Sequence, residues 1–117
     1  MALMRDLTRV FKALSDVNRI RILKMLEVRP LCVCEIREVL ALATSTVSKH
    51  LSLLRDAGFI VDEKAGKWVN YSLDTSKTNA YTAQLMPLLA RWLPEDVIIR
   101  QDAEKVRSVD RDSICGT

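Results

Sequence analysis

Apolar residues recur at helical spacing along most of this chain, and the most informative segment is residues 42–58, LATSTVSKHLSLLRDAG. Its apolar positions, at i, i+4 and i+7, are Val47, Leu51 and Leu54. This spacing predicts a helix with one buried face, which Thr44 is suited to cap at its start and Gly58 to end. The opposite face carries small hydroxyls and cations, which let a helix approach phosphates and base edges closely. A DNA-reading helix and an ordinary polar surface helix fit this segment about equally well.

The preceding segment favours the DNA-reading interpretation. Residues 34–41, CEIREVLA, carry Ile36, Val39 and Leu40 at helical spacing and end only a few residues before Thr44. Two short helices joined this tightly must cross at a large angle, which is the helix-turn-helix arrangement.

The following segment predicts a β-hairpin. Residues 60–64 and 67–73 are rich in strand-forming side chains, and they flank a two-residue Ala65-Gly66 turn. A lysine on each side of this turn is well placed to reach a DNA phosphate. A helix-turn-helix followed directly by such a hairpin is a winged helix.

The rest of the chain predicts further helices. They are expected at residues 3–14, 16–28, 81–93 and 95–107. Ser15 or Asp16 is suited to cap the second of these, and Pro87 is expected to bend or restart the third. The expected fold is therefore mainly α with a small β-hairpin, in the order ααααββαα. Residues 1–107 would form one domain, and residues 108–117 a flexible polar tail.

Two of the three cysteines stand at the start of the first helix of the helix-turn-helix. Cys32 is expected at its N-cap, Cys34 in its first turn, and Glu35 in the position of a capping-box acid. Unpaired backbone N–H groups and the helix dipole favour a thiolate there, and a thiolate is a soft metal ligand. The alternative is that both cysteines are small buried hydrophobic residues. Their i, i+2 spacing within one helical turn favours a functional role.

The composition and net charge are compatible with a small DNA-binding protein but do not by themselves identify one. A chain of 117 residues, of which 49% are hydrophobic, is long enough for one domain. Its formal net charge of +3 permits nucleic-acid binding without requiring it. No segment has the length of a membrane span, and the N-terminus lacks the apolar run of a signal peptide. We therefore expect a cytoplasmic protein with no membrane partner, whose cysteines are thiols.

Four blocks of the sequence, in this order, resemble the ArsR/SmtB family of winged-helix, metal-sensing transcriptional repressors: ALSDVNRIRILKML, LCVCEIREVL, STVSKHLSLLRDAGFI and GKWVNYSL. The resemblance is close over roughly residues 7–73 and loose over the C-terminal helices. The Cys32-Val33-Cys34 pair most resembles the arsenite-responsive branch. The resemblance implies a homodimeric repressor, not an enzyme, that binds double-stranded operator DNA and is released by As(III) or Sb(III).

The resemblance also implies a set of sulfur ligands. Trivalent arsenic and antimony prefer three thiolates, and Cys32 with Cys34 supplies two. Some arsenite-responsive relatives place a third cysteine one helical turn further on, but this chain has Arg37 there. The remaining sulfur donor of the right type is Cys115, which could reach the pair from the same subunit or from the other.

The family resemblance assigns further residues to DNA and to the dimer. Residues expected to contact DNA are Thr44, Ser45, Thr46, Ser48, Lys49, His50, Lys64 and Lys67, while Arg55 is expected to be structural. Residues expected at the dimer interface are Leu3, Leu7, Val10, Leu85, Leu88, Leu89 and Trp92.

Some other functions stay open as alternatives, and others are disfavoured. The same repressor could respond to cysteine oxidation, or to a soft divalent ion such as cadmium or lead. Zinc is disfavoured, because a zinc site wants four ligands and the single histidine, His50, lies in the DNA-reading helix. A thiol enzyme would need a CxxC-like pair with acid and base groups, which the CVC pair and one histidine do not supply.

Overall fold

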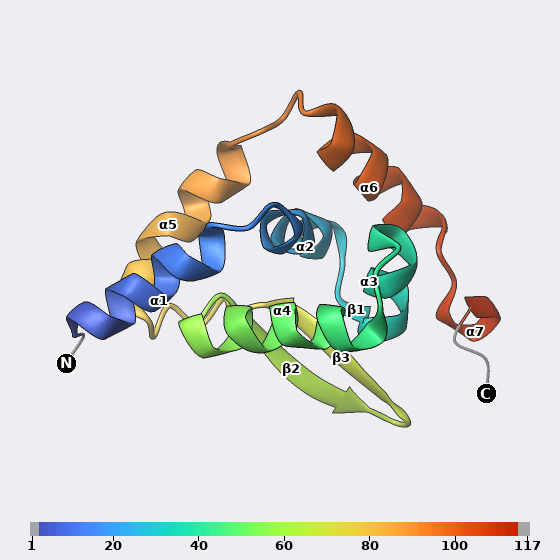
Figure 1. Cartoon of the computed structure of the whole chain (residues 1–117), viewed down its shortest axis with the longest axis horizontal. Coiled ribbons are helices and arrows are strands. Elements are labelled where there is room, and N and C mark those ends of the chain that lie inside the picture. Colours follow the sequence, from blue (N-terminus) through green and yellow to red (C-terminus); the bar gives the residue numbers. More distant parts are fainter. Residues whose placement is uncertain (1–2, 115–117) are drawn as a thin grey trace.

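The computed structural model describes residues 3–114 and shows helices grouped around a central helix, with a small three-stranded sheet at one edge (Figure 1). In chain order the elements are α1 (Met4–Leu14), α2 (Val17–Val28), β1 (Leu31–Cys32), α3 (Val33–Leu40), α4 (Thr44–Ala57), β2 (Ile60–Ala65), β3 (Trp68–Leu73), α5 (Ala80–Arg91), α6 (Val97–Ser108) and α7 (Arg111–Ile114). The mainly helical winged helix-turn-helix expected from the sequence is confirmed. None of the helices in the described part of the chain is long and apolar enough to cross a membrane.

The sheet is antiparallel, with strand order β1-β3-β2. Ala65 pairs with Trp68, so the hairpin turn is Gly66-Lys67, one residue later than expected. Gly66 has φ +62°, a left-handed conformation that glycine adopts without strain. The strand β1 was not expected, because two residues are too short to show an alternating pattern. It places Cys32 directly opposite Asn70 of β3.

The helix-turn-helix forms around the apolar face of α4. The three predicted core positions Val47, Leu51 and Leu54 are buried, and α4 packs against α1, α2 and α3. Gly58 ends α4 with φ +94°, as predicted. Thr44, however, is the first residue of the helix and not its cap. The N-cap is Ala43, which has no side-chain oxygen to offer the first turn.

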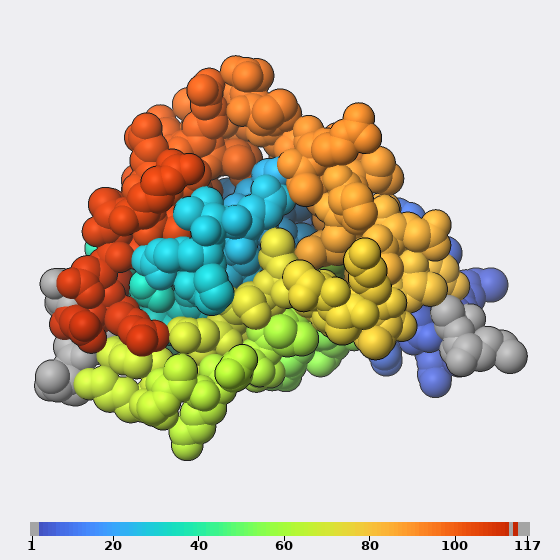
Figure 2. Space-filling model, turned by 180° about the vertical axis from the view of Figure 1, so that it is seen from behind, coloured from blue at the N-terminus to red at the C-terminus, as the bar shows by residue number. Residues whose placement is uncertain are grey.

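The remaining helices enclose α2. Its N-cap is Asp16, whose carboxylate accepts hydrogen bonds from the N–H groups of Asn18 and Arg19. Seen from the opposite side, α2 and the chain that follows it lie between α5 and α6, with the β-hairpin below (Figure 2). The α5 helix continues through Pro87, so a restart at this residue is wrong. Pro87 lies close to the C-terminal end, where the loss of one backbone hydrogen bond interrupts little of the helix.

The last described residues are not a free tail. After α6, the chain turns and forms the short helix α7, which packs against α3. Arg111 reaches from α7 to Asn70 of the hairpin. The sequence from 108 to 114 is polar, and its docking depends on partners that are distant in the sequence. Residues 111–114 of the segment expected as a flexible tail thus form a short helix that packs against α3.

Candidate DNA-binding surface and thiol pair

The exposed face of α4 presents the predicted DNA-contacting residues together. Thr44, Ser45, Thr46, Ser48 and Lys49 are all exposed. Because Ala43 provides no side-chain cap, the first N–H groups of α4 are free of side-chain acceptors at the positive end of the helix dipole. Small hydroxyls, a cation and these amides together suit a DNA backbone, and the hydroxyls also suit base edges.

His50 differs from its neighbours because it is half-buried beside Arg19. Its Nδ1 lies 3.1 Å from Nη1 of Arg19. A guanidinium can only donate, so Nδ1 is the acceptor and the ring proton is on Nε2. Arg19 also donates to the carbonyls of Ala13 and Lys12, at 2.9 and 3.1 Å. Arg19 is thus a structural residue that joins the end of α1 to α4, and only Nε2 of His50 remains for a DNA contact.

The wing extends this surface. Lys64 and Lys67 are exposed near the hairpin tip, and Nζ of Lys67 lies 5.1 Å from the centroid of the Trp68 ring. Arg55 of α4 donates to the Asp62 carboxylate of β2 at 3.2 Å. This ion pair joins the helix to the wing, in agreement with the structural role expected of Arg55.

The thiol pair lies at the start of α3. Cys32 is the N-cap, its side chain is buried, and its N–H donates to Oε1 of Glu35 at 3.0 Å. The capping box is therefore confirmed. Cys34 is half-buried in the first turn and is engaged in an interaction of its own. Cys115 lies outside the described residues. Within residues 3–114, no group of three cysteine, histidine or carboxylate side chains could hold a metal ion, so the described chain supplies a pair of sulfur donors only.

Burial changes the expected chemistry of Cys32. Removal of the thiol from water raises its pKa, and the neighbouring Glu35 side chain raises it further. Hydrogen bonds from the backbone act in the opposite direction but do not prevail. The expectation of a thiolate stabilised by the helix terminus is therefore wrong for Cys32, because desolvation outweighs the helix dipole there.

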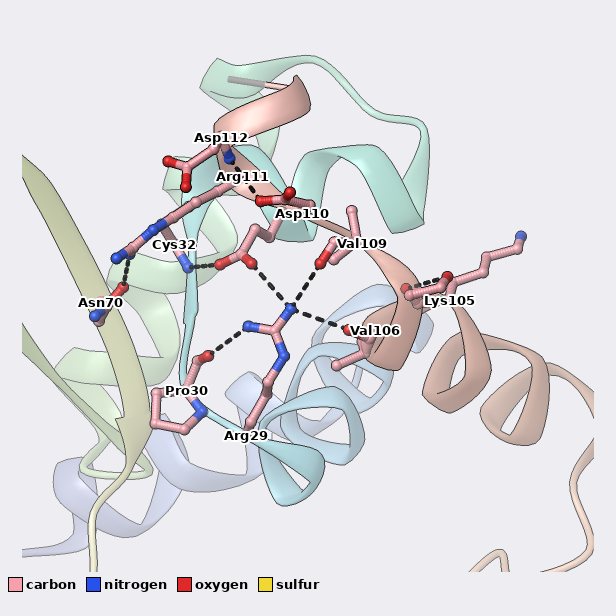
Figure 3. Close-up of polar contacts among 12 residues, drawn as sticks. Arg29, Pro30, Cys32, Asn70, Lys105, Val106, Val109, Asp110, Arg111 and Asp112 are labelled. Atoms are coloured by element: carbon pink, nitrogen blue, oxygen red, sulfur yellow. Dashed lines mark hydrogen bonds and ion pairs between the residues drawn. The ribbon is translucent and has the colours of Figure 1, made fainter. Parts of the chain in front are cut away.

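A half-buried arginine that the sequence analysis missed organises this site. Nη2 of Arg29 lies 2.9 Å from Oε2 of Glu35 and also donates to the carbonyls of Val106 and Val109, at 3.0 and 3.1 Å (Figure 3). Arg29 thereby fixes the carboxylate that caps Cys32 and joins the end of α6 to α3. Its partners lie up to 80 residues away in the sequence, so no local pattern could identify it.

The predicted dimer residues divide by exposure. Leu3, Leu88 and Trp92 are exposed, whereas Leu7, Leu85 and Leu89 are half-buried. Val10 has no exposed surface and packs in the core of its own chain. Val10 therefore offers no exposed surface to a second subunit, and the dimer interface as a whole stays a prediction. Exposed apolar side chains that the prediction omitted include Met4 and Phe11 on α1.

Comparison with known proteins identifies the family to which this chain is similar. The model of the family described as bacterial regulatory protein, arsR family, matches residues 16–61. The chain is 37% identical to the arsenical resistance operon repressor of Escherichia coli strain K12, over 91% of this chain and 92% of that protein. It is 44% identical to a cadmium resistance regulatory protein CadC homolog of Staphylococcus aureus, over 59% of this chain and 58% of that protein. A crystal structure of an ArsR family transcriptional regulator matches with a TM-score of 0.60 and 28% identity, over 79% of this chain and 96% of that one.

Proposed function

Because the chain belongs to the ArsR family of DNA-binding transcriptional regulators, which are not enzymes, we propose that it is a repressor that leaves its operator when As(III) or Sb(III) binds its thiols. The observation that carries this proposal is the pair of cysteines at the N-cap and in the first turn of α3, the helix directly before the one that presents the DNA-binding surface. The arsenical resistance repressor that is 37% identical over most of the chain supports the choice of effector.

The proposed effector site consists of Cys32, Cys34 and Cys115. Cys32 and Cys34 lie on one helical turn and supply two sulfur donors of the soft type that trivalent arsenic requires. A third donor must come from elsewhere, since Arg37 stands one turn further along α3. Cys115 directly follows the last described residue, Ile114, in a segment whose helix α7 packs on α3.

The proposed DNA complex is that of a homodimer. Two copies of α4 related by a twofold axis would enter successive major grooves of an inverted repeat, with Lys64 and Lys67 on the flanking backbone. The exposed apolar residues of α1 and α5, among them Leu3, Leu88 and Trp92, would lie between the subunits. Thr46 and Ser48 would read base edges, and Lys49 would neutralise phosphate.

The effector would act through a coupling free energy. It must bind the DNA-incompetent conformation more tightly than the competent one, because a ligand with equal affinity for both shifts nothing. Since α3 braces α4, a ligand that moves the start of α3 would misalign the two DNA-reading helices of the dimer.

The direct test is a fluorescence anisotropy titration of the reduced protein on DNA from its own promoter. We expect stoichiometric arsenite to release the wild-type protein, and to release a Cys115→Ser variant less completely. Operator binding without arsenite should be equal in the two proteins. If arsenite does not dissociate the protein–DNA complex, the proposed effector is wrong, although the proposed DNA binding still holds.

Cadmium or lead is the second candidate effector. It is favoured by the 44% identity, over 70 residues, to a cadmium resistance regulatory protein CadC homolog, and these ions also bind three thiolates. The same titration with Cd²⁺ or Pb²⁺ in place of arsenite distinguishes the two. Release by peroxide alone would instead indicate a redox sensor.

Lys49→Ala is expected to weaken operator binding and to reduce its salt dependence. Lys49 is exposed on α4, and each lysine that neutralises a phosphate releases about one counterion. We expect the slope of log affinity against log salt to fall by about two units for a dimer. Lys105→Ala, on the distant helix α6, is the matched control and should leave the slope unchanged. If the slope for Lys49→Ala equals that of the wild-type protein, Lys49 of α4 does not contact a DNA phosphate.

A further inference from the structure

A chain of contacts runs from the backbone N–H of Cys32 to the C-terminal end of α6. The N–H of Cys32 donates to Oε1 of Glu35, and Oε2 of the same carboxylate accepts from Arg29. Arg29 in turn donates to the carbonyl of Val109 (Figure 3). The side chain of Glu35 is only 4% exposed and that of Arg29 is 35% exposed, so the carboxylate is the shielded partner of this ion pair. The position of Val109 is therefore fixed relative to Cys32.

A second set of contacts returns from Val109 to Cys32 through the wing. Two residues after Val109, Nη1 of Arg111 donates to Oδ1 of Asn70 at 3.0 Å, and its guanidinium lies 5.2 Å from the centroid of the Trp68 ring. Asn70 is the residue of β3 that pairs with Cys32 of β1. The contacts thus form a closed ring that joins the thiol helix, the end of α6 and the wing strand.

Cys32, whose sulfur an effector must reach, is only 3% exposed, and two of its neighbours, Glu35 and Asn70, belong to this ring. A ligand atom therefore cannot bond to the sulfur unless residues around Cys32 move. The Arg29–Glu35 pair is costly to separate, because it would leave a buried carboxylate without its partner. The contacts of Arg111 are weaker, since its side chain is half-buried and its partner Asn70 is uncharged. The ring is expected to open at Arg111.

We propose that residues 109–114, here called the strap, hold the wing in its DNA-binding position through Arg111 and are displaced when an effector enters at Cys32. Arg111 is then a positioning residue that makes the affinity of the wing for DNA depend on the state of the thiols. This regulation rests on the proposed function, because it requires an effector that binds Cys32. The ring itself exists whichever effector is bound.

The first test measures access to Cys32 without arsenite or DNA. In a full-length Cys34→Ser, Cys115→Ser background, Cys32 is the one remaining thiol, and its reaction rate with a small thiol reagent reports how often the ring opens. Arg111→Ala removes one hydrogen bond and one cation–π contact, so we expect the rate to rise by roughly fivefold. Arg107→Ala removes an exposed cation on α6 and should leave the rate unchanged. Equal rates for Arg111→Ala and its parent would overturn the proposal.

The second test measures the consequence for DNA. With all three cysteines present, Arg111→Ala should weaken operator binding by roughly fivefold in the absence of arsenite, and arsenite should then release it by a smaller factor than wild type. Hydrogen exchange in β3 should become faster in the same variant. If operator binding weakens with a reduced salt slope while Cys32 reactivity and β3 exchange stay at the parental level, Arg111 contacts phosphate directly and the strap is refuted.

Failure of the strap and failure of the proposed function give different results. If arsenite does not release the wild-type protein but Arg111→Ala still exposes Cys32, the assigned effector is wrong and the strap stands. If arsenite releases Arg111→Ala and wild type from DNA by the same factor, the effector stands and the strap is overturned.

Discussion

Cys34→Ser and Cys32→Ser variants are each expected to bind operator DNA as wild type does and to lose their response to arsenite. A serine hydroxyl nearly preserves the size of the thiol, but its hard oxygen does not replace sulfur as a ligand for trivalent arsenic. Allosteric coupling typically changes affinity by about 5-fold to 150-fold, and each variant should bring this factor close to one. Operator anisotropy with and without arsenite measures it.

The two variants test different surroundings. Cys32 is buried at the N-cap of α3, where serine is a favoured residue, so the helix should form normally. Cys34, two residues after Cys32, is half-buried in the first turn of the helix. Lys49→Ala is the complementary control, because it should lose DNA affinity while still binding arsenite. If either serine variant fails to bind DNA in the absence of effector, the thiols are part of the DNA-binding fold, and the proposed separation of sensing from DNA binding is wrong.

The helix-turn-helix could be predicted because its information is local. The apolar face of α4 repeats within one helix, and Gly58 ends the helix because a left-handed residue is needed at that position. The hairpin was also predicted from its turn, although the turn lies one residue later than expected. In each case the residues that determine the structure are neighbours in sequence.

The environment of the thiols could not be predicted in this way. The helix dipole is a local effect, and on its own it favoured ionisation of Cys32. Burial of that side chain depends on β3 and the rest of the fold, and it raises the pKa instead. The contacts of Arg29 with Val109 and of Arg111 with Asn70 span 80 and 41 residues. Neither Arg29 nor Arg111 belongs to a local sequence pattern that could indicate such distant partners.

A buried ion pair between α2 and α6 is a further long-range contact with a large consequence. Nε and Nη2 of Arg21 donate to the two carboxylate oxygens of Asp102, at 2.8 and 2.9 Å. Asp102 is 2% exposed, and its hydrogen bonds and charge raise the pKa of Arg21. This bidentate pair fixes the angle at which α6 lies on α2, and α6 carries the carbonyl of Val106 that Arg29 binds.

Asp102→Asn is therefore expected to lower the free energy of unfolding by about 3 kcal/mol, because it leaves a partly buried guanidinium without its counterion. For a chain of this size, the melting temperature should fall by about 12 °C when protein concentration is held constant. Glu95→Gln is the matched control, since its ion pair is with Arg100 of the same helix α6 and both partners are exposed. An exposed pair contributes little, so that variant should melt within about 2 °C of wild type. Thermal unfolding followed by circular dichroism measures the melting temperatures of both variants. Equal melting temperatures would show that α6 is held by its apolar contacts with α2 and not by the Arg21–Asp102 ion pair.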